Sequence, residues 1–212
     1  MIKRKLNADG NEIDVGVFSP EEKCMGKTYG QYLAESWNKL VSDDPDISDD
    51  PVLFLRTSAD PKEAPLIQKL TIFSDQAIFI PIITSAMNIS DSGDLDTESK
   101  RRAAANKEID GGDDPPKPEQ LTIDGKPIVD DLKHFRVESP EFVLNVQDQS
   151  PVKDKLDVPY PAGAWPTVAA GYCVLINSLA SRVKPYTIHM KANGRDTYFT
   201  EAIYEIQVND RK

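Results

Sequence analysis

The spacing of apolar residues changes along the chain. Over 28–41 these residues recur at helical spacing and make one apolar face; Thr28 precedes the first turn and Pro45 follows the last. Threonine caps helix N-termini well, and proline cannot continue a helix. The pattern therefore predicts an amphipathic helix at 28–41, docked on the rest of the fold through Trp37.

Most other apolar residues fall in short runs of residues. In some of these runs apolar and polar residues alternate, and in others every residue is apolar; both patterns are typical of strands. These runs cover 13–18, 52–55, 68–73, 77–83, 121–129, 135–140, 141–146, 171–177, 186–190 and 200–208. Many short strands, two helices and Pro-rich loops predict a mainly β fold, an antiparallel β-sandwich of jelly-roll type. The clean alternation in 200–208 indicates a sheet with one face in water.

Two of these runs contain residues with special backbone requirements. Run 77–83 is apolar on both faces, which favours a central strand, but Pro81 inside it favours an edge strand or a bulge. The residues leave both interpretations open. Asp124-Gly125 stands between two apolar stretches and predicts a tight hairpin.

The sequence predicts a single domain over residues 26–212, preceded by an N-terminal extension over residues 1–25. We expect the extension to be polar and irregular, apart from a short edge strand at 13–18. Polar insertions near 42–51, 90–120 and 147–167 are expected at the ends of the sandwich, because each is rich in Pro, Asp or Gly. The insertion at 90–120 includes a predicted surface helix over 94–108.

Composition narrows the classes of function that the protein can have. The chain has 212 residues, 25 Lys+Arg against 35 Asp+Glu, and a net charge of −10, which argues against nucleic acid as a partner. No apolar run is long enough to span a membrane. The basic start lacks the apolar stretch of a signal peptide, so we expect the protein in the cytoplasm or in an assembled particle. Two Cys and two His leave little material for catalysis.

A calcium site is the first chemical candidate. Five aspartates gather within ten residues at Asp43, Asp44, Asp46, Asp49 and Asp50. Calcium takes six to eight oxygen ligands from flexible loops, although the glycine and glutamate of an EF-hand loop are misplaced here. The alternative is a solvated acidic loop. Calcium is the one cofactor that the sequence leaves open.

The other candidate sites are aromatic, imidazole or thiol groups. Trp165, between small residues and a proline, lies near Tyr160; the pair would suit a sugar-binding face, or Trp165 closes the end of the sandwich. His189 is either a sheet-surface residue or an acid–base group or metal ligand. Cys173 lies in an apolar run, which favours a core thiol over a nucleophile, and both it and Cys24 are expected to be free and buried. A hydrolase would need a carboxylate pair such as Asp124 and Glu138.

Six short motifs follow one another in a fixed order. They are Gly26-Lys-Thr-Tyr-Gly with a Trp-bearing helix, Ile78-Phe-Ile-Pro-Ile-Ile, Thr122-Ile-Asp-Gly-Lys-Pro, Phe135-Arg-Val-Glu-Ser-Pro-Glu-Phe, Ala170-Gly-Tyr and Tyr186-Thr-Ile-His. Over about residues 26–208 the chain resembles a family of uncharacterised bacterial and archaeal β-rich proteins. The resemblance implies a β-rich fold and no activity, and it draws attention to His189. The chain departs from the family in having Trp37 alone in the first helix and in lacking an export signal.

We therefore expect a non-catalytic structural or assembly protein that contacts itself or another protein, such as a capsid, lattice or filament component. A calcium- or carbohydrate-binding sandwich module is the alternative, and a hydrolase of unknown substrate is the second.

Overall fold

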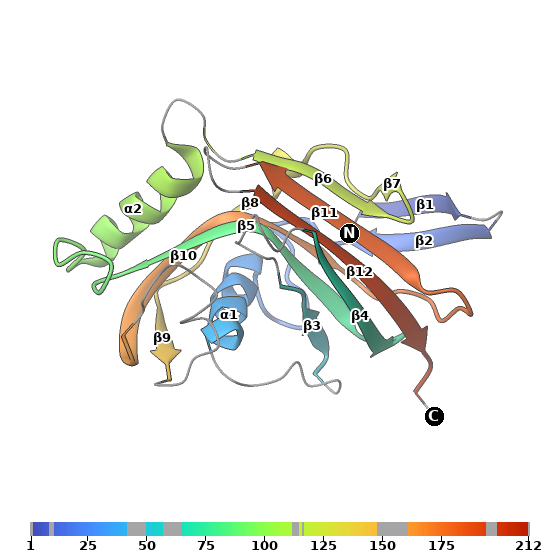
Figure 1. Ribbon diagram of the computed structural model, residues 1–212, viewed down its shortest axis with the longest axis horizontal. Helices are drawn as coiled ribbons and strands as arrows, with labels where there is room; N and C mark the ends of the chain where they lie inside the picture. The colour runs from blue at the N-terminus through green and yellow to red at the C-terminus, as the bar shows by residue number, and fades with distance from the viewer. Residues whose placement is uncertain are drawn as a thin grey trace.

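The computed structural model describes residues 2–8, 11–41, 50–56, 65–111, 115, 117–147, 161–193 and 199–211 (Figure 1). One sheet has seven strands: β1 (Ile2–Ala8), β2 (Asn11–Val17), β3 (Val52–Phe54), β5 (Ala77–Asn88), β8 (Arg136–Glu138), β9 (Phe142–Val146) and β10 (Gly163–Ile176). The other has five: β4 (Leu66–Phe73), β6 (Lys117–Ile123), β7 (Lys126–Pro127), β11 (Tyr186–Asn193) and β12 (Phe199–Asn209). The described helices are α1 (Tyr29–Val41), α2 (Glu98–Asp110) and the short 3-10 turn η1 (Leu132–Phe135).

The expected mainly β sandwich is confirmed, with a correction to the direction of its strands. β3 pairs with β5 in parallel, and β4 pairs with β12 in parallel, so neither sheet is purely antiparallel. Parallel neighbours need a crossover connection, and runs of alternating residues do not reveal which strands such a connection joins. The strand order does not confirm the jelly-roll form.

β10 organises the seven-stranded sheet. It pairs with β5 along one edge, and on its other edge it meets β9, β8 and β2 in succession. The strand begins at Gly163, inside the insertion expected at 147–167, and β6 begins at Lys117, inside the insertion expected at 90–120. Both places contain prolines, which are typical of loops, and the sequence therefore predicts loops there. Pro166 lies before Thr167, the first residue of β10 that pairs with β5, and a strand tolerates proline at such a position.

β5 is both a central strand and a bulged one, which reconciles the two interpretations of Pro81. It lies between β10 and β3, and the register shifts so that Tyr172 pairs with Ile83 while Cys173 pairs with Pro81. The N–H of Ala77 donates to Pro51 and the C=O of Phe79 accepts from Leu55, so odd residues direct their backbone groups toward β3. Pro81 is also an odd residue, so its backbone nitrogen faces the side of β3. It lies beyond Phe79, the last residue of β5 that pairs with β3, so no hydrogen bond between the two strands is lost because proline has no N–H.

Helix α1 covers the face of the seven-stranded sheet opposite the five-stranded sheet. The rings of Tyr29 and Tyr32 pack against Phe79 of β5, while Ile78 and Ile80, on the other side of that strand, are fully buried, and β5 also contacts β11 and β6. The predicted helix and the burial of Trp37 are confirmed.

The start of α1 is fixed by a reciprocal cap. The Thr28 hydroxyl accepts the N–H of Gln31 at 3.3 Å, and the Gln31 amide oxygen accepts the N–H of Thr28 at 2.9 Å. At Gly30 a side chain would stand 2.2 Å from the C=O of Glu138, so only glycine lets α1 approach β8 this closely.

Helix α2 is the predicted surface helix, shifted by a few residues to Glu98–Asp110 because Thr97 caps it. Its apolar contact is small: Ala105 and Ile109 pack on Ala170, with Met87 and Tyr172 beside them. Figure 1 shows α2 at the end of the sandwich where β5 and β10 extend beyond the other sheet.

The N-terminal residues correct the expectation of an irregular extension. β1 and β2 form an antiparallel hairpin from the pair Ile2–Val17 to the pair Ala8–Asn11. The strand expected at 13–18 is therefore real, but it is not an edge, because β1 lies outside it. Asp9-Gly10, between the two strands, is a hairpin signal in the sequence, like Asp124-Gly125. At Asp124 and Gly125 the φ angles are +50° and +75°, as the predicted tight turn requires.

Among the described residues, no helix has the length and apolar character needed to cross a membrane.

Candidate functional site

A pocket of about 300 Å³ lies between β6 and the chain that returns from β7 to η1. Its residues come from only these two stretches: Pro118, Glu119, Gln120, Leu121, Thr122, Pro127, Val129, Asp130, Asp131, Leu132 and Lys133. The pocket follows from the shortness of β7, which pairs only with Thr122 and Ile123. Past that point the returning chain leaves β6, and the two segments are no longer in register.

The wall of the pocket combines apolar surface with a few polar groups, as ligand sites do. Thr122 is 4% exposed, and its hydroxyl has no hydrogen-bond partner among the residues that the structure describes. A buried hydroxyl without a partner costs about 1–3 kcal/mol, so this one is available for a ligand group. Glu119 forms an ion pair with Lys191 at 3.1 Å, and Asp131 accepts the N–H of Lys133 at the start of η1.

His189 lies next to the pocket residues Thr122 and Gln120, on the outer face of the five-stranded sheet. It pairs across strands with Thr122, and its Nε2 lies 2.7 Å from Oε1 of Glu201. Its Nδ1 lies 3.4 Å from the amide nitrogen of Gln120, which also lines the pocket. A histidine held on both ring nitrogens has a fixed ring plane, so the contacts orient His189 and tie β6 to β12.

Trp165 lies in β10 rather than in a loop. It pairs with Leu144 of β9, is partly buried against the core, and donates its indole N–H to the C=O of Pro161 at 2.8 Å. Tyr160, its expected companion, lies outside the described residues. The structure therefore locates Trp165 in β10, and the described residues do not include the second aromatic residue of the expected pair.

Of the five candidate calcium ligands, Asp43, Asp44, Asp46 and Asp49 lie outside the described residues. Asp50 is described, and its carboxylate pairs with Lys39 of α1 at 2.5 Å. In the part of the chain that the structure covers, no group of three or more His, Cys, Asp or Glu side chains is arranged to hold a metal ion.

The thiols agree with the expectation of free, buried cysteines. Cys24 and Cys173 are both free and buried. Burial raises the pKa of the Cys173 thiol far above its ordinary value of 9.0, which disfavours the nucleophilic thiolate.

Asn88 belongs to a glycosylation triplet in the sequence, Asn88-Ile-Ser90. It is fully buried, and its side-chain oxygen accepts a hydrogen bond from the N–H of Ser90.

The two carboxylates considered for hydrolysis belong to different sheets. Asp124, in the β6–β7 turn, accepts the N–H of Thr187 at 3.0 Å and pairs with Arg182 at 2.7 Å. Glu138 lies in β8 and is bound by Arg102 and Asn106 of α2. Each carboxylate thus has a structural partner set of its own.

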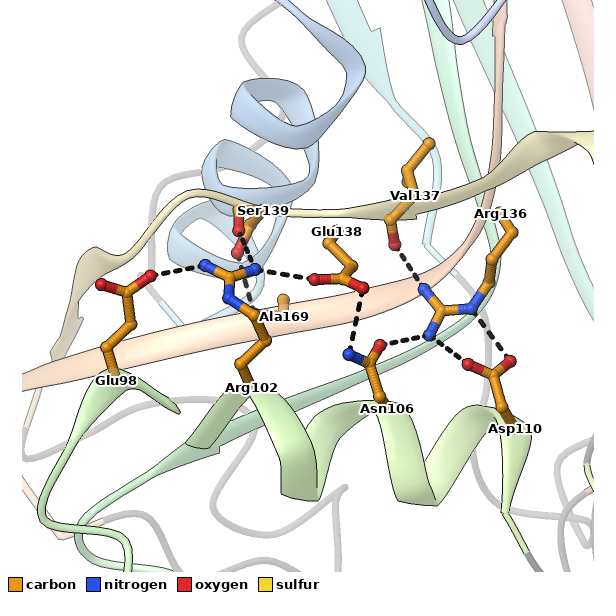
Figure 2. A network of polar contacts seen from close by, with 9 residues as sticks. All are labelled: Glu98, Arg102, Asn106, Asp110, Arg136, Val137, Glu138, Ser139 and Ala169. Atoms are coloured by element: carbon orange, nitrogen blue, oxygen red, sulfur yellow. Dashed lines mark hydrogen bonds and ion pairs between the residues drawn. The ribbon is translucent and has the colours of Figure 1, made fainter. Parts of the chain in front are cut away.

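Glu138 belongs to a polar network that holds α2 on the seven-stranded sheet (Figure 2). Glu98, Arg102, Asn106 and Asp110 recur every four residues and so share one face of the helix. Arg102 donates to Glu98 at 2.6 Å, to Glu138 at 2.8 Å and to the C=O of Ser139 at 3.0 Å. This row of side chains makes a continuous contact with β8.

The second half of the network centres on Arg136. Its guanidinium donates to both carboxylate oxygens of Asp110, at 3.0 and 2.7 Å, and to the side-chain oxygen of Asn106 at 2.5 Å (Figure 2). A third nitrogen donates to the C=O of Val137 at 2.6 Å. Since every group in this network is satisfied by another, we assign it to the docking of α2.

The residues missed by sequence reasoning are the pocket residues. Glu119, Thr122 and Asp130 lie within or beside the predicted hairpin, but only the short β7 and the departure of the chain after it bring them together. The one signal available was the pair Asp130-Asp131 directly after an apolar stretch.

No family model, curated protein sequence or solved structure matches this chain.

Proposed function

We propose that this is a non-catalytic assembly protein that acts by self-association. The observation that carries the proposal is the β1–β2 hairpin. It joins the rest of the seven-stranded sheet through a single register pair, Val17 with Ile176, and in the described chain β1 has β2 as its one neighbouring strand over all seven residues. A strand edge with free backbone groups is a template for pairing with another chain.

A second edge shows how this protein covers a strand that is not meant to pair. The side-chain amide of Asn38 in α1 donates to the C=O of Val143 and accepts the N–H of Asn145, both at 3.1 Å. Asn38 thus occupies the outer edge of β9 in place of a strand. The contrast between the covered edge of β9 and the projecting hairpin supports a role for the hairpin in association (Figure 1).

The state of the reactive side chains favours contact over catalysis. The thiol of Cys173 is buried, and His189 is engaged by Gln120 and Glu201 on a sheet surface. Cys173 packs in the core and His189 links strands within one sheet, and a protein whose reactive side chains are used in this way works most simply through its surface.

The test is light scattering of the purified chain across a range of concentrations. We expect a mass that is a multiple of the 23.6 kDa chain and that falls on dilution. A protein that stays monomeric throughout the range contradicts the proposal.

Proline variants at adjacent positions of β1, Arg4→Pro and Lys5→Pro, locate the contact. In an antiparallel pair, alternate residues direct their N–H to the partner strand or away from it. One variant therefore disrupts the hairpin itself, and the other blocks only its free edge. Amide exchange of β2 identifies which is which, and the edge-blocking variant should stay monomeric with β2 still protected.

A further inference from the structure

We infer that β1 pairs antiparallel with β1 of a second copy of this chain, about a two-fold axis at Leu6, so that two seven-stranded sheets become one continuous sheet. The inference rests on the proposed self-association and names both the partner strand and the register of the contact. Three observations carry it: the direction of the backbone groups of β1, the order of residue types along the hairpin, and the symmetry that such an edge allows.

The direction of the backbone groups is set where β2 meets β10. The C=O of Gly16 accepts from Asn177, and the N–H of Phe18 donates to Leu175. Even-numbered residues on this side of the hairpin therefore direct their backbone groups toward β10. Because alternate residues of an antiparallel strand face opposite neighbours, the odd-numbered residues of β2 face β1.

The register of the hairpin carries this alternation into β1. Odd-numbered residues of β2 pair with even-numbered residues of β1, as Val17 does with Ile2. The even-numbered residues of β1 thus make the hydrogen bonds of the hairpin. Lys3, Lys5 and Asn7 direct their N–H and C=O groups the other way, to an edge beside which the described residues place no strand.

An axis at Leu6 continues an apolar row of the hairpin into the second copy. Leu6 stands opposite Ile13 in the register of β1 with β2. By alternation Ile13 shares a strand face with Val15 and Val17, which are fully buried in the core. With Leu6 beside the partner's Leu6, the positions across four strands are Ile, Leu, Leu and Ile. A hydrophobic pattern of this kind fixes the register of a sheet.

Axes at the preceding residues bring basic residues together. An axis at Lys5 matches all three outward-facing residues, but it sets Lys5 opposite the partner's Lys5, and an axis at Arg4 sets two arginines opposite each other. Like charges directly opposite destabilise a sheet. With the axis at Leu6, Lys5 lies between Asp14 of its own β2 and the partner's Asn7. This register therefore separates the basic residues of the two copies.

Symmetry favours β1 itself as the partner strand. Two identical edges that pair about a two-fold axis cover each other, so neither stays open. β4 is also an edge strand, since β12 is its one neighbouring strand in the described chain. Pairing of β1 with β4 would leave one β1 edge open at the end of every assembly, so β4 is the alternative partner that cross-linking has to distinguish.

Single cysteines test the axis. Leu6→Cys, Lys5→Cys and Arg4→Cys are oxidised at a concentration where light scattering shows association, and are separated on non-reducing gels. Two copies of a residue at the axis have Cα atoms about 4.5–5.5 Å apart, within reach of a disulfide, whereas one residue away from it the distance is about 8 Å. We expect a covalent dimer from Leu6→Cys alone. The unaltered chain is the control, because Cys24 and Cys173 are buried.

A second measurement leaves Leu6 in place. Lys5→Cys chains mixed with Asn7→Cys chains should cross-link to each other, because these positions face one another across the contact. The matched control mixes Lys5→Cys with Thr71→Cys of β4 and should give no covalent dimer. Cross-linking of Lys5→Cys to itself overturns the register. Cross-linking to Thr71→Cys in place of Asn7→Cys overturns β1 as the partner in favour of β4.

Proline variants of the outward-facing residues give an independent readout. Lys5→Pro removes an N–H from the contact and leaves the hydrogen bonds with β2, so it should be monomeric by light scattering. Lys3→Pro removes an N–H from the same edge, but its position lies opposite the partner chain beyond the end of β1. It should therefore associate like the unaltered chain, and loss of association in Lys3→Pro contradicts the axis at Leu6.

The outcomes separate this inference from the proposed function. Association that is lost in Lys5→Pro, but gives no cross-link in Leu6→Cys or between Lys5→Cys and Asn7→Cys, overturns the pairing of β1 with itself and leaves assembly through the hairpin intact. A chain that is monomeric at every concentration contradicts assembly itself, before any cysteine is introduced.

Discussion

The backbone N–H of Leu175 in β10 donates to the hydroxyl of Tyr29 in α1 at 3.0 Å. The same hydroxyl donates to the C=O of Phe18, just past β2, at 2.6 Å. Next to it the ladder between these strands continues, where Phe18 donates to Leu175 and Asn177 donates to Gly16. The phenol of α1 therefore replaces one rung of the sheet, and it links the helix to the root of the N-terminal hairpin.

Removing that hydroxyl should destabilise the protein. Tyr29→Phe removes the partner of the buried Leu175 N–H and of the partly buried Phe18 C=O, and we expect the free energy of unfolding to fall by about 2–3 kcal/mol in urea denaturation. Tyr32→Phe is the matched control, because the Tyr32 hydroxyl donates to the C=O of Cys24 in a turn, and its loss should cost about 1 kcal/mol. Equal losses in the two variants would contradict the inserted rung.

Stability should fall at alkaline pH. Burial raises the pKa of Cys173 and of Tyr29 above their ordinary values of 9.0 and 10.0. The unfolded chain therefore loses these protons first, so the stabilisation is lost as pH rises, above about pH 9 for Cys173 and above about pH 10 for Tyr29, by about 1.4 kcal/mol per pH unit for each group. Urea denaturation between pH 8 and pH 10 measures the loss that comes from Cys173. Cys173→Ala should show a smaller slope between pH 9 and pH 10, and an unchanged slope would contradict the assignment.

The docking of α2 should depend on the shape of the Arg136 guanidinium. Arg136→Lys keeps the charge but cannot contact both oxygens of Asp110 and Asn106 together, and with the side chain 19% exposed we expect a loss of about 1 kcal/mol. Hydrogen exchange should show faster opening of α2. The pair of Lys100 with Asp96 is exposed on both sides, so Lys100→Met should leave stability nearly unchanged. Unchanged exchange in Arg136→Lys would show that apolar contacts alone hold α2.

The covered edge of β9 offers a further test. Asn38→Asp keeps the acceptor for Asn145 and loses the donor to Val143, whereas Asn38→Ala loses both. Amide exchange at Asn145 should therefore accelerate in the alanine variant and much less in the aspartate variant. We also expect aggregation on heating to increase with alanine, because the edge is then open. Identical behaviour of the two variants would show that Asn38 does not protect this edge.

Local pattern was enough to locate most elements of this fold. The α1 face, the Asp124-Gly125 turn and the alternation in β12 are all set by residues close in sequence. The bulge at Pro81 and the parallel pairing of β4 with β12 were not accessible, because each depends on which distant strand lies alongside. Glycine at position 30 is a similar case, since its reason is a carbonyl more than a hundred residues away.

The candidate site was harder to predict than the fold. Residues with notable chemistry, such as Trp165 and Cys173, turned out to serve packing. The pocket is built instead from ordinary side chains, and it exists because β7 is two residues long. A composition of Glu, Asp and Thr does not identify such a site until the strand beside it is known to end.

The position of β12 has a consequence for how the chain matures during synthesis. β12 is the last strand in sequence, yet it lies between β4 and β11 in the five-stranded sheet. While a nascent chain still lacks residue 199, β4 is without the one neighbour that it has among the described strands of its sheet, and the inner surface of that sheet stays incomplete. Domains generally fold as units as they emerge, so this one has to wait for its final strand and then close around it. Fragments truncated before β12 should accordingly depend on chaperones and be degraded, however long they are.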